Sequence, residues 1–201
     1  RQHCAVAEPE RIKYISGALL AGRRVRYFSD WQIEGKPPAG VEPAATAEQA
    51  DFVLTLTPEG EALHIVPRIA VLGIGCKRGT SECRLQEAFS AFCAANTLVP
   101  QSVAAAASID LKKDERGLLD FAKNHGWTTE FYTADTLRAV RGHFTASQFV
   151  KGVTGVDNVC ERAAVKAAGG KLFIPKWAYN GVTFAVALRP FAPDWRWKTD
   201  G

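Results

Sequence analysis

The sequence predicts a three-layer α/β/α sandwich over residues 69–190, a small and incomplete α/β domain over residues 1–68, and a tail over residues 191–201. Three observations support this prediction. The 201 residues suffice for one large domain or two small ones. Apolar residues make up 47% of them and charged residues 23%, which is enough for a complete core. From residue 69 onward, strand-like and helix-like apolar patterns alternate.

The elements of the first domain follow from spacing and from turn residues. Isoleucines and leucines recur at helical spacing within residues 9–22, between a proline and a glycine. Residues 24–28 alternate like a strand, and two further short strands are expected at residues 52–57 and 63–66. Residues 34–44 are so rich in proline and glycine that we expect only a loop there.

The second domain shows a denser alternation of elements. Its expected strands are residues 69–74, 103–109, 128–132, 171–174 and 182–188. Its expected helices are one capped by Thr80 or Ser81, then residues 115–125, residues 134–140 and residues 157–168 with Asp157 as the N-cap. The dipeptide Asn180-Gly181 is typical of a turn between the last two strands. Strands that alternate with helices predict helices on both faces of one sheet.

The clearest local motif is GIGCKRGTS, residues 73–81, between a buried strand and a helix. A helix that begins there would offer free N–H groups and a positive dipole end to an anion, with Lys77 and Arg78 beside it. The motif matches neither a Walker A loop nor a full dinucleotide fingerprint. Anion binding is the favoured interpretation, and a purely structural turn is the alternative. Cys76 could be a nucleophile at this position, but no histidine lies nearby in sequence, so a small buried side chain is the preferred role.

Further polar residues lie at the ends of expected strands. In SIDLKKDE, residues 108–115, the side chains of Ser108, Asp110 and Lys112 would point into the crevice at the carboxyl edge of the sheet. The alternative is a loop that supplies a helix cap. Farther along the chain, the polar residues that would share one helical turn are Asn158, Glu161 and Arg162, and they could equally form a surface ion pair. Lys176 and Asn180 are again edge residues.

Charge and cysteine content exclude several classes of protein. The formal charge is +4, and the last 61 residues hold nine basic and four acidic side chains, which favours a polyanionic ligand. No nucleic-acid recognition motif accompanies this charge, so nucleic acid is not expected as a partner. Five scattered cysteines without a Cys-x-x-Cys pair favour the reducing cytoplasm. No apolar run is long enough to span a bilayer, and the lack of methionine suggests a piece of a longer protein.

Four motifs together resemble the carboxy-terminal domain of the CbiG/CobE family, in the same order and at the same separations. They are GIGCKRGTS, SIDLKKDE, GVDNVCERAA and KLFIPKWAYNGVTFAVAL, and the resemblance covers residues 69–190. Residues 1–68 are more loosely similar to the central domain of the family's hydrolase, through GRRVRYFSD. The amino-terminal domain usual in the family has no counterpart here, so a missing or fused biosynthetic domain is expected as a partner.

The resemblance implies a hydrolase of cobalamin biosynthesis. The family opens the ring A lactone of cobalt-precorrin-5A and releases acetaldehyde, giving cobalt-precorrin-5B. Cobalt would arrive with this substrate, so neither a cofactor nor a metal site of the chain's own is expected. A non-catalytic carrier of tetrapyrrole intermediates is the alternative, and a nucleotide or phosphate module is a third possibility.

The resemblance also assigns roles to residues. Glu161 or Asp110 would activate the water that opens the lactone. The expected substrate-binding residues are Gly73, Gly75, Cys76, Lys77, Arg78, Thr80, Ser108, Lys112, Ser147, Asn158, Arg162, Lys176 and Asn180. In the tail, Trp195 and Trp197 would pack on a missing domain or partner.

Overall fold

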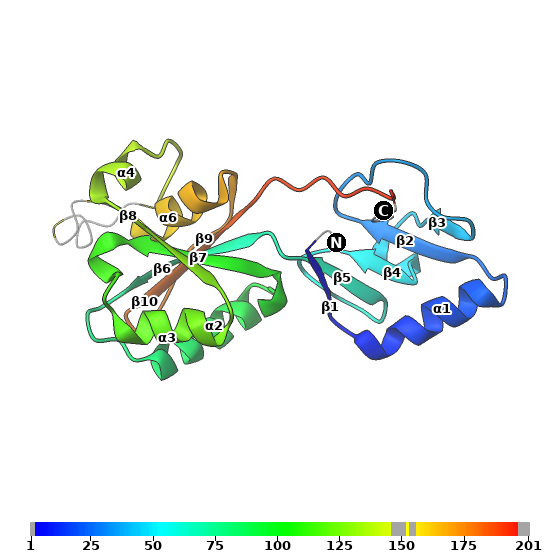
Figure 1. Ribbon diagram of the computed structural model, residues 1–201, viewed down its shortest axis with the longest axis horizontal. Coiled ribbons are helices and arrows are strands. Elements are labelled where there is room, and N and C mark those ends of the chain that lie inside the picture. The colour runs from blue at the N-terminus through cyan, green and yellow to red at the C-terminus, as the bar shows by residue number, and fades with distance from the viewer. Residues whose placement is uncertain (1–2, 146–151, 153–155, 197–201) are drawn as a thin grey trace, which may run out of the picture. The chain divides into compact units, whose positions relative to one another are not determined.

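A computed structural model describes residues 3–145, 152 and 156–196. The chain divides into two compact units, drawn in Figure 1. The first unit comprises Arg1–Arg68 together with Phe191–Gly201, and the second comprises Ile69–Pro190. We describe each unit by itself.

The described residues of the first unit form a five-stranded sheet with one α-helix. Its elements are β1 (Cys4–Val6), a 3-10 turn (Pro9–Arg11), α1 (Ile12–Leu20), β2 (Val25–Ser29), β3 (Val41–Pro43), a 3-10 turn (Ala47–Gln49), β4 (Phe52–Leu54) and β5 (Leu63–Pro67). The strand order is β1-β5-β4-β2-β3, and only β1 runs antiparallel to its neighbour. None of the residues of α1 is buried, so this helix covers the sheet only in part.

Two elements of this unit were not predicted from sequence. Strand β1 pairs with β5 although it has only three residues. Strand β3 lies inside the Pro- and Gly-rich stretch, where the prediction of loop alone was wrong, because an edge strand tolerates proline on its unpaired side.

The segment that was expected to form a tail is part of this unit as far as Arg196. Asp194 forms a β-bridge with Glu34, and the ring of Trp195 packs edge-on against Tyr27 at 4.9 Å between centroids. Trp195 therefore contacts its own chain rather than an absent partner, whereas Trp197 lies outside the described residues.

The second unit has the elements of an α/β sandwich. They are β6 (Ala70–Cys76), α2 (Glu82–Ala95), a 3-10 turn (Pro100–Ser102), β7 (Val103–Ile109), a 3-10 turn (Asp110–Lys112), α3 (Arg116–Asn124), β8 (Thr128–Tyr132), α4 (Ala134–Ala139), α6 (Val159–Ala168), β9 (Lys171–Tyr179) and β10 (Val182–Leu188). The strand order is β8-β7-β6-β10-β9, with β10 antiparallel to both of its neighbours. The carboxyl ends of β6, β7, β8 and β9 therefore lie at one edge of the sheet.

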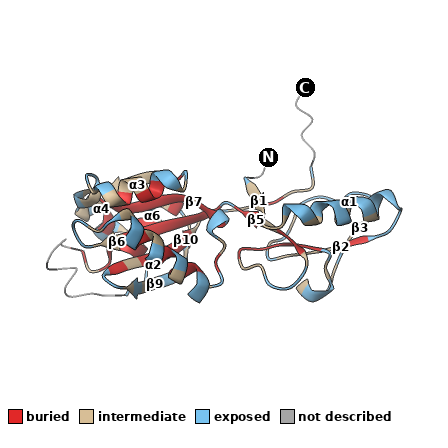
Figure 2. Ribbon diagram, turned by 90° about the horizontal axis from the view of Figure 1, so that it is seen from below, coloured by how far each residue is buried: buried red, intermediate tan, exposed pale blue. Residues whose placement is uncertain are grey.

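Helices cover both faces of this sheet, which confirms the predicted three-layer sandwich. Helices α2 and α3 lie on one face, and α4 and α6 on the other (Figure 1). Alternate residues of each strand enter different cores: Leu72 and Ile74 pack with the α2 and α3 side, and Val71 packs with α6. The three central strands β6, β7 and β10 are mostly buried, whereas the edge strands β8 and β9 are only partly buried (Figure 2).

Details of the second unit differ from the sequence expectations. Strand β6 continues through Cys76, so Gly73 lies within a strand and not in a turn. Asn158, rather than Asp157, caps α6, because its side chain accepts the hydrogen bond from the Glu161 N–H. Ser81 caps α2, as one of the two predicted alternatives. Within the described part of the chain, no helix has both the length and the apolar character needed to cross a membrane.

Candidate functional site

The second unit contains a cavity of about 610 Å³ at the carboxyl edge of its sheet. It lies where β6, β7 and β9 end and β10 begins, which is the usual position for ligands in open α/β sheets. Nine of the predicted substrate-binding residues line this edge pocket: Gly75, Cys76, Lys77, Arg78, Ser108, Lys112, Asn158, Lys176 and Asn180.

The edge pocket combines an apolar interior with cationic side chains. Its apolar lining comes from the end of β7, the start of α6 and the start of β10. Four cations line it: Lys77 and Arg78 from the turn after β6, Lys112 from the 3-10 turn after β7, and Lys176 from β9. The described lining residues include no carboxylate. Such a cavity favours a ligand with an apolar body and negatively charged groups.

Glu115 lies beside the edge pocket and occupies part of the predicted anion site. The Gly79 N–H donates to Oε2 of Glu115 at 2.9 Å, while Oε1 lies 3.5 Å from Lys112 Nζ and 3.7 Å from Arg78 Nε. The Gly79 hydrogen bond, followed by the charges of Lys112 and Arg78, lowers the pKa of Glu115 despite its burial. An internal carboxylate thus already binds the turn that the sequence predicted to bind an external anion.

Lys77 and Lys176 differ from Arg78 and Lys112, which lie near Glu115. No ion pair to Lys77 or Lys176 is found among the described residues. Lys77 extends over the hairpin turn, where a Cβ on Gly181 would lie 3.4 Å from its Cε. Both Asn180 and Gly181 have positive φ, at 47° and 83°, as a two-residue type I′ turn requires. The tight hairpin leaves room for Lys77 at the pocket.

The hydroxyl and thiol groups of the edge pocket are held by the protein itself. Ser108 Oγ donates to the Ile74 carbonyl at 2.7 Å, and Thr183 Oγ1 donates to the Gly75 carbonyl at 3.2 Å. Burial raises the pKa of the Cys76 thiol, although Lys112 acts in the opposite direction. The raised pKa favours the thiol over the thiolate, as the interpretation of Cys76 as a small side chain expects.

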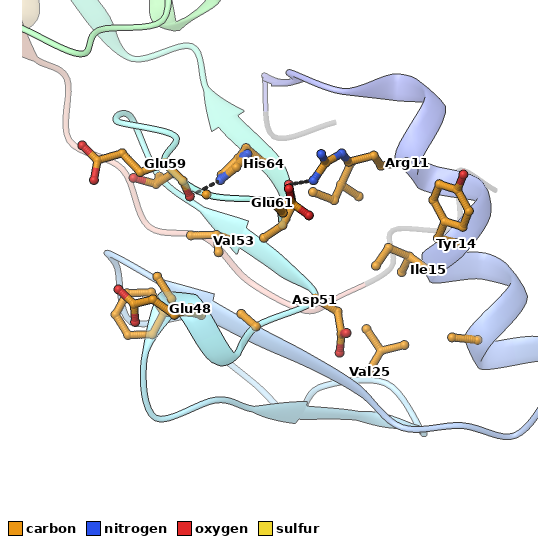
Figure 3. Close-up of a pocket in the computed structure, with 18 of the residues that line it drawn as sticks. Arg11, Tyr14, Ile15, Val25, Glu48, Asp51, Val53, Glu59, Glu61 and His64 are labelled. Carbon is orange, nitrogen blue, oxygen red and sulfur yellow. Dashed lines mark hydrogen bonds between the residues drawn. The ribbon is translucent and has the colours of Figure 1, made fainter.

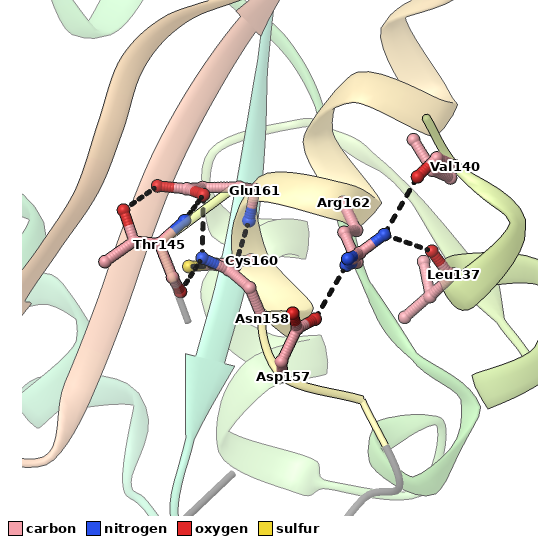
Figure 4. A network of polar contacts seen from close by, with 8 residues as sticks. All are labelled: Leu137, Val140, Thr145, Asp157, Asn158, Cys160, Glu161 and Arg162. Carbon is pink, nitrogen blue, oxygen red and sulfur yellow. Dashed lines mark hydrogen bonds and ion pairs between the residues drawn. The ribbon is translucent and has the colours of Figure 1, made fainter. Parts of the chain in front are cut away.

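Glu161 is fully buried and has no free acceptor position for a water molecule. Its Oε1 accepts from the Lys176 N–H at 2.6 Å and from Thr145 Oγ1 at 2.9 Å. Its Oε2 accepts from Asn158 Nδ2 at 2.7 Å and from the Thr145 N–H at 2.8 Å. Figure 4 shows the contacts with Thr145 and Asn158. The geometry does not support the predicted role of Glu161 in activating water.

The remaining predicted residues lie outside the lining of the edge pocket. Arg162 binds Asp157 at 2.9 Å and the Val140 carbonyl at 2.8 Å, so it fastens α4 to α6 (Figure 4). Thr80 Oγ1 donates to the Lys77 carbonyl within the turn. A Cβ on Gly73 would lie 1.8 Å from the Cys160 carbonyl oxygen, so this glycine permits close packing of α6.

Two predicted residues stand apart from these contacts. Asp110 follows β7 but does not line the edge pocket. Ser147 lies outside the described residues.

Several lining residues were missed from the sequence. Tyr179 ends β9 directly before the Asn-Gly turn, and this position could have placed it at the same edge as Asn180. Leu111 lies in the SIDLKKDE motif and is 52% exposed. Thr183 carries no sequence signal, because its place in the edge pocket depends on the pairing of β10 with β6.

The first unit contains a larger cavity of about 1390 Å³ with a different chemical character (Figure 3). It lies along α1 and the strands β2, β4 and β5. Its acidic lining residues are Glu10, Asp30, Glu48, Asp51, Glu59 and Glu61, and its basic ones are Arg11, Lys13 and Arg23, with His64 beside them. Both ring nitrogens of His64 have partners, Nδ1 with Glu8 and Nε2 with the Glu59 carbonyl, so they take part in structure.

The fold and the edge pocket define an α/β domain suited to anionic small molecules with an apolar body. Residues 70–187 match the model of the family described as cobalamin synthesis G C-terminus, and the chain belongs to this family. The match includes all of the described lining residues of the edge pocket and all of the strands of the second unit except the last residue of β10.

Two curated relatives are cobalt-precorrin-5A hydrolases. The one from Priestia megaterium is 33% identical over 126 residues, which are 62% of this chain and 33% of the relative. The one from Salmonella typhimurium strain LT2 is 33% identical over 124 residues, which are 62% of this chain and 35% of the relative. The chain therefore matches about a third of the length of these relatives.

One solved structure supports this assignment, and a second one shares the fold. CobE, described as a protein from the cobalamin (vitamin B12) biosynthetic pathway, superposes with a TM-score of 0.57 at 27% identity, over 62% of this chain and 93% of CobE. A putative cobalamin biosynthesis protein G homolog from Sulfolobus solfataricus has a TM-score of 0.52 at 18% identity and covers 94% of this chain and 58% of its own. At that identity the second likeness concerns the fold alone.

Proposed function

We propose that this chain acts in cobalamin biosynthesis as the substrate-holding part of a cobalt-precorrin-5A hydrolase. The observation that carries the proposal is the edge pocket, in which four cations surround an apolar interior with no carboxylate among its described lining residues. A tetrapyrrole intermediate is a broad apolar macrocycle with carboxylates at its rim, so both features of the cavity suit it. The curated relatives supply the reaction.

The proposed reaction opens the ring A lactone with water and releases acetaldehyde. It requires a base for the water and donors for the oxyanion that forms on the lactone carbonyl. Lys77 and Lys176 can supply positive charge for such an oxyanion or for a side-chain carboxylate of the substrate. The base is expected outside the described lining of the edge pocket, since Glu161 is saturated with hydrogen bonds. Cobalt would enter with the substrate, and a cytoplasmic location remains part of the proposal.

The test is a titration with cobalt-precorrin-5A, followed by the spectrum of the macrocycle. Lys77→Ala should weaken binding several-fold, because it removes a cation that has no ion-pair partner among the described residues. Arg78→Ala should weaken binding less, since the Arg78 side chain is 84% exposed and lies near Glu115. Lys113→Ala is the matched control, because Lys113 is exposed and does not line the pocket. Equal affinities for all four proteins would reject the edge pocket as the binding site.

A second candidate function is a carrier of tetrapyrrole intermediates without chemistry of its own. It is favoured by the lack of a carboxylate among the described lining residues and by the match to nearly the whole length of CobE. An assay for acetaldehyde in the titrated samples separates the two candidates. Release of acetaldehyde identifies a hydrolase, whereas binding without release identifies a carrier.

A further inference from the structure

Strand β9 contains a bulge beside the edge pocket. Ile174 pairs with Val186 and Trp177 pairs with Phe184, so two residues of β9, Pro175 and Lys176, stand opposite one residue of β10. A bulge of this kind breaks the hydrogen-bond ladder and redirects a side chain, often next to a functional site. Pro175 has no N–H to lose, which suits it to this position.

Glu161 takes up the backbone N–H that the bulge leaves outside the ladder. The hydrogen bond from the Lys176 N–H to Glu161 Oε1 measures 2.6 Å. The other three partners of Glu161 are donors as well, two from Thr145 and one from Asn158. Both oxygens of Glu161 therefore act as acceptors, each for two hydrogen bonds.

Burying a carboxyl group costs desolvation free energy, which opposes folding. No ion pair to Glu161 is found among the described residues, and its side chain is completely inaccessible to solvent. Well-packed apolar residues usually serve stability as well as a buried charge does. The partners of Glu161 suggest another reason for it. Lys176 and Asn158 both line the edge pocket, on β9 and at the start of α6 respectively.

We propose that Glu161 is a positioning residue that fixes the β9 bulge and thereby holds the Lys176 ammonium in the edge pocket, where it binds a carboxylate of the ligand. The inference rests on the proposed function for the identity of the ligand. The hydrogen bonds of Glu161 join the start of α6 to the bulge, so the two pocket walls keep a fixed separation. Glu161 contacts no ligand itself in this account.

A double-mutant cycle in the whole chain tests whether Glu161 acts through Lys176. Glu161→Gln replaces one acceptor oxygen by a donor and should weaken the binding of cobalt-precorrin-5A by about 10-fold, as the loss of a charge-assisted hydrogen bond implies. Lys176→Met should weaken it by a similar factor. Glu161→Gln should then cause no further loss in the Lys176→Met background. Glu130→Gln, which removes a carboxylate on β8, is the control and should bind normally.

Additive losses in the cycle would overturn the inference, since they would show that Glu161 acts on the pocket independently of Lys176. A second readout needs no ligand: amide hydrogen exchange at Lys176, followed by NMR, should be at least about 10-fold faster in Glu161→Gln than in the unaltered chain. Unchanged exchange at Lys176 would also overturn it. Failure of the unaltered chain to bind cobalt-precorrin-5A would instead count against the proposed function, and the exchange measurement would still decide the role of Glu161.

Thr145→Val covers the case in which Glu161→Gln does not fold. This variant removes one of the four donors and leaves the carboxylate in place. It should accelerate exchange at Lys176 and weaken ligand binding, each by a smaller factor than Glu161→Gln. No change at Lys176 in a folded Thr145→Val protein would contradict the proposed coupling.

Discussion

The two units share a sheet architecture and differ in how that sheet is covered. Both sheets have five strands. Four neighbouring strands are parallel in the first sheet and three in the second, but only the second unit has helices buried against both faces. In the first unit, the single helix α1 has no buried residue, and Tyr14 and Leu20 on it are exposed. Coverage, rather than strand count, therefore decides which unit has an extensive core.

The cavities of the two units differ in the charge of the residues that line them. The edge pocket is lined by four cations and no carboxylate among its described lining residues, whereas the cavity of the first unit is lined by six carboxylates and three permanent cations. The larger cavity is thus the poorer candidate for an anionic ligand. Cavity size favours the first unit, whereas the charge of the lining favours the second unit for an anionic ligand.

The largest expected effect is a difference in core stability. Phe89→Ala in the second unit should lower the free energy of unfolding by about 3–5 kcal/mol, because the Phe89 ring is buried among Phe121, Trp127 and Phe184. Ile15→Ala on α1 should lower it by about 1 kcal/mol, since Ile15 is only partly buried. Urea denaturation followed by circular dichroism measures both. Equal losses would break the contrast between the two units.

Replacement of two glycines by alanine should change the stability of the protein in opposite directions. Gly73→Ala places a Cβ 1.8 Å from the Cys160 carbonyl oxygen and should destabilise the second unit by about 1–3 kcal/mol. A Cβ on Gly17 meets no atom within 4 Å, so Gly17→Ala should stabilise α1 by up to about 1 kcal/mol. Thermal melting of both variants gives the two signs. Stabilisation by Gly73→Ala would show that α6 does not pack closely on β6.

Acid should destabilise each unit by protonating one carboxylate with a lowered pKa, Glu8 in the first unit and Glu115 in the second. Burial alone would raise the pKa of Glu8, but the hydrogen bonds from the His64 N–H and ring outweigh burial and lower it below its ordinary 4.5. The stabilisation by Glu8 is therefore complete above about pH 4.5 and is lost as the pH falls through the lowered pKa. The Gly79 N–H lowers the pKa of Glu115 in the second unit, so the same sign holds there.

Denaturation between pH 7 and pH 3 checks this prediction. Glu8→Gln should flatten the acid dependence of the first unit, and Glu115→Gln that of the second. The cross-pairs serve as controls, because each variant should leave the acid dependence of the other unit unchanged. An unaltered pH profile in both variants would contradict the stabilising role of the two carboxylates.

The smallest expected effect tests whether the acidic cavity takes part in ligand binding. Glu61→Gln removes a carboxylate from the lining of that cavity and should leave the affinity for cobalt-precorrin-5A unchanged within about 1.5-fold, a difference of about 0.2 kcal/mol. Lys77→Ala, by comparison, should weaken it several-fold. The titration already described measures both, and a change of several-fold in Glu61→Gln would move ligand binding toward the first unit.

Much of the second unit could be predicted from its sequence alone. The strands at 103–109, 128–132 and 182–188 were predicted with the bounds that the structure has, because turn residues and apolar runs mark them locally. The four motifs also identified the family and nine residues of the edge pocket. In the first unit, strands β1 and β3 were not predicted: each has only three residues, and β3 lies in a stretch rich in proline and glycine.

The roles of individual side chains depended on the tertiary structure. Local patterns and composition were enough to predict the fold class, the position of the candidate site at the carboxyl edge of the sheet, and its cationic character. It could not show that Glu115 occupies the Gly79 turn, that α6 packs on Gly73, or that Glu161 holds Lys176. Each of these contacts joins residues that are 15 or more positions apart in the chain, and such distant pairs are brought together only when the elements pack.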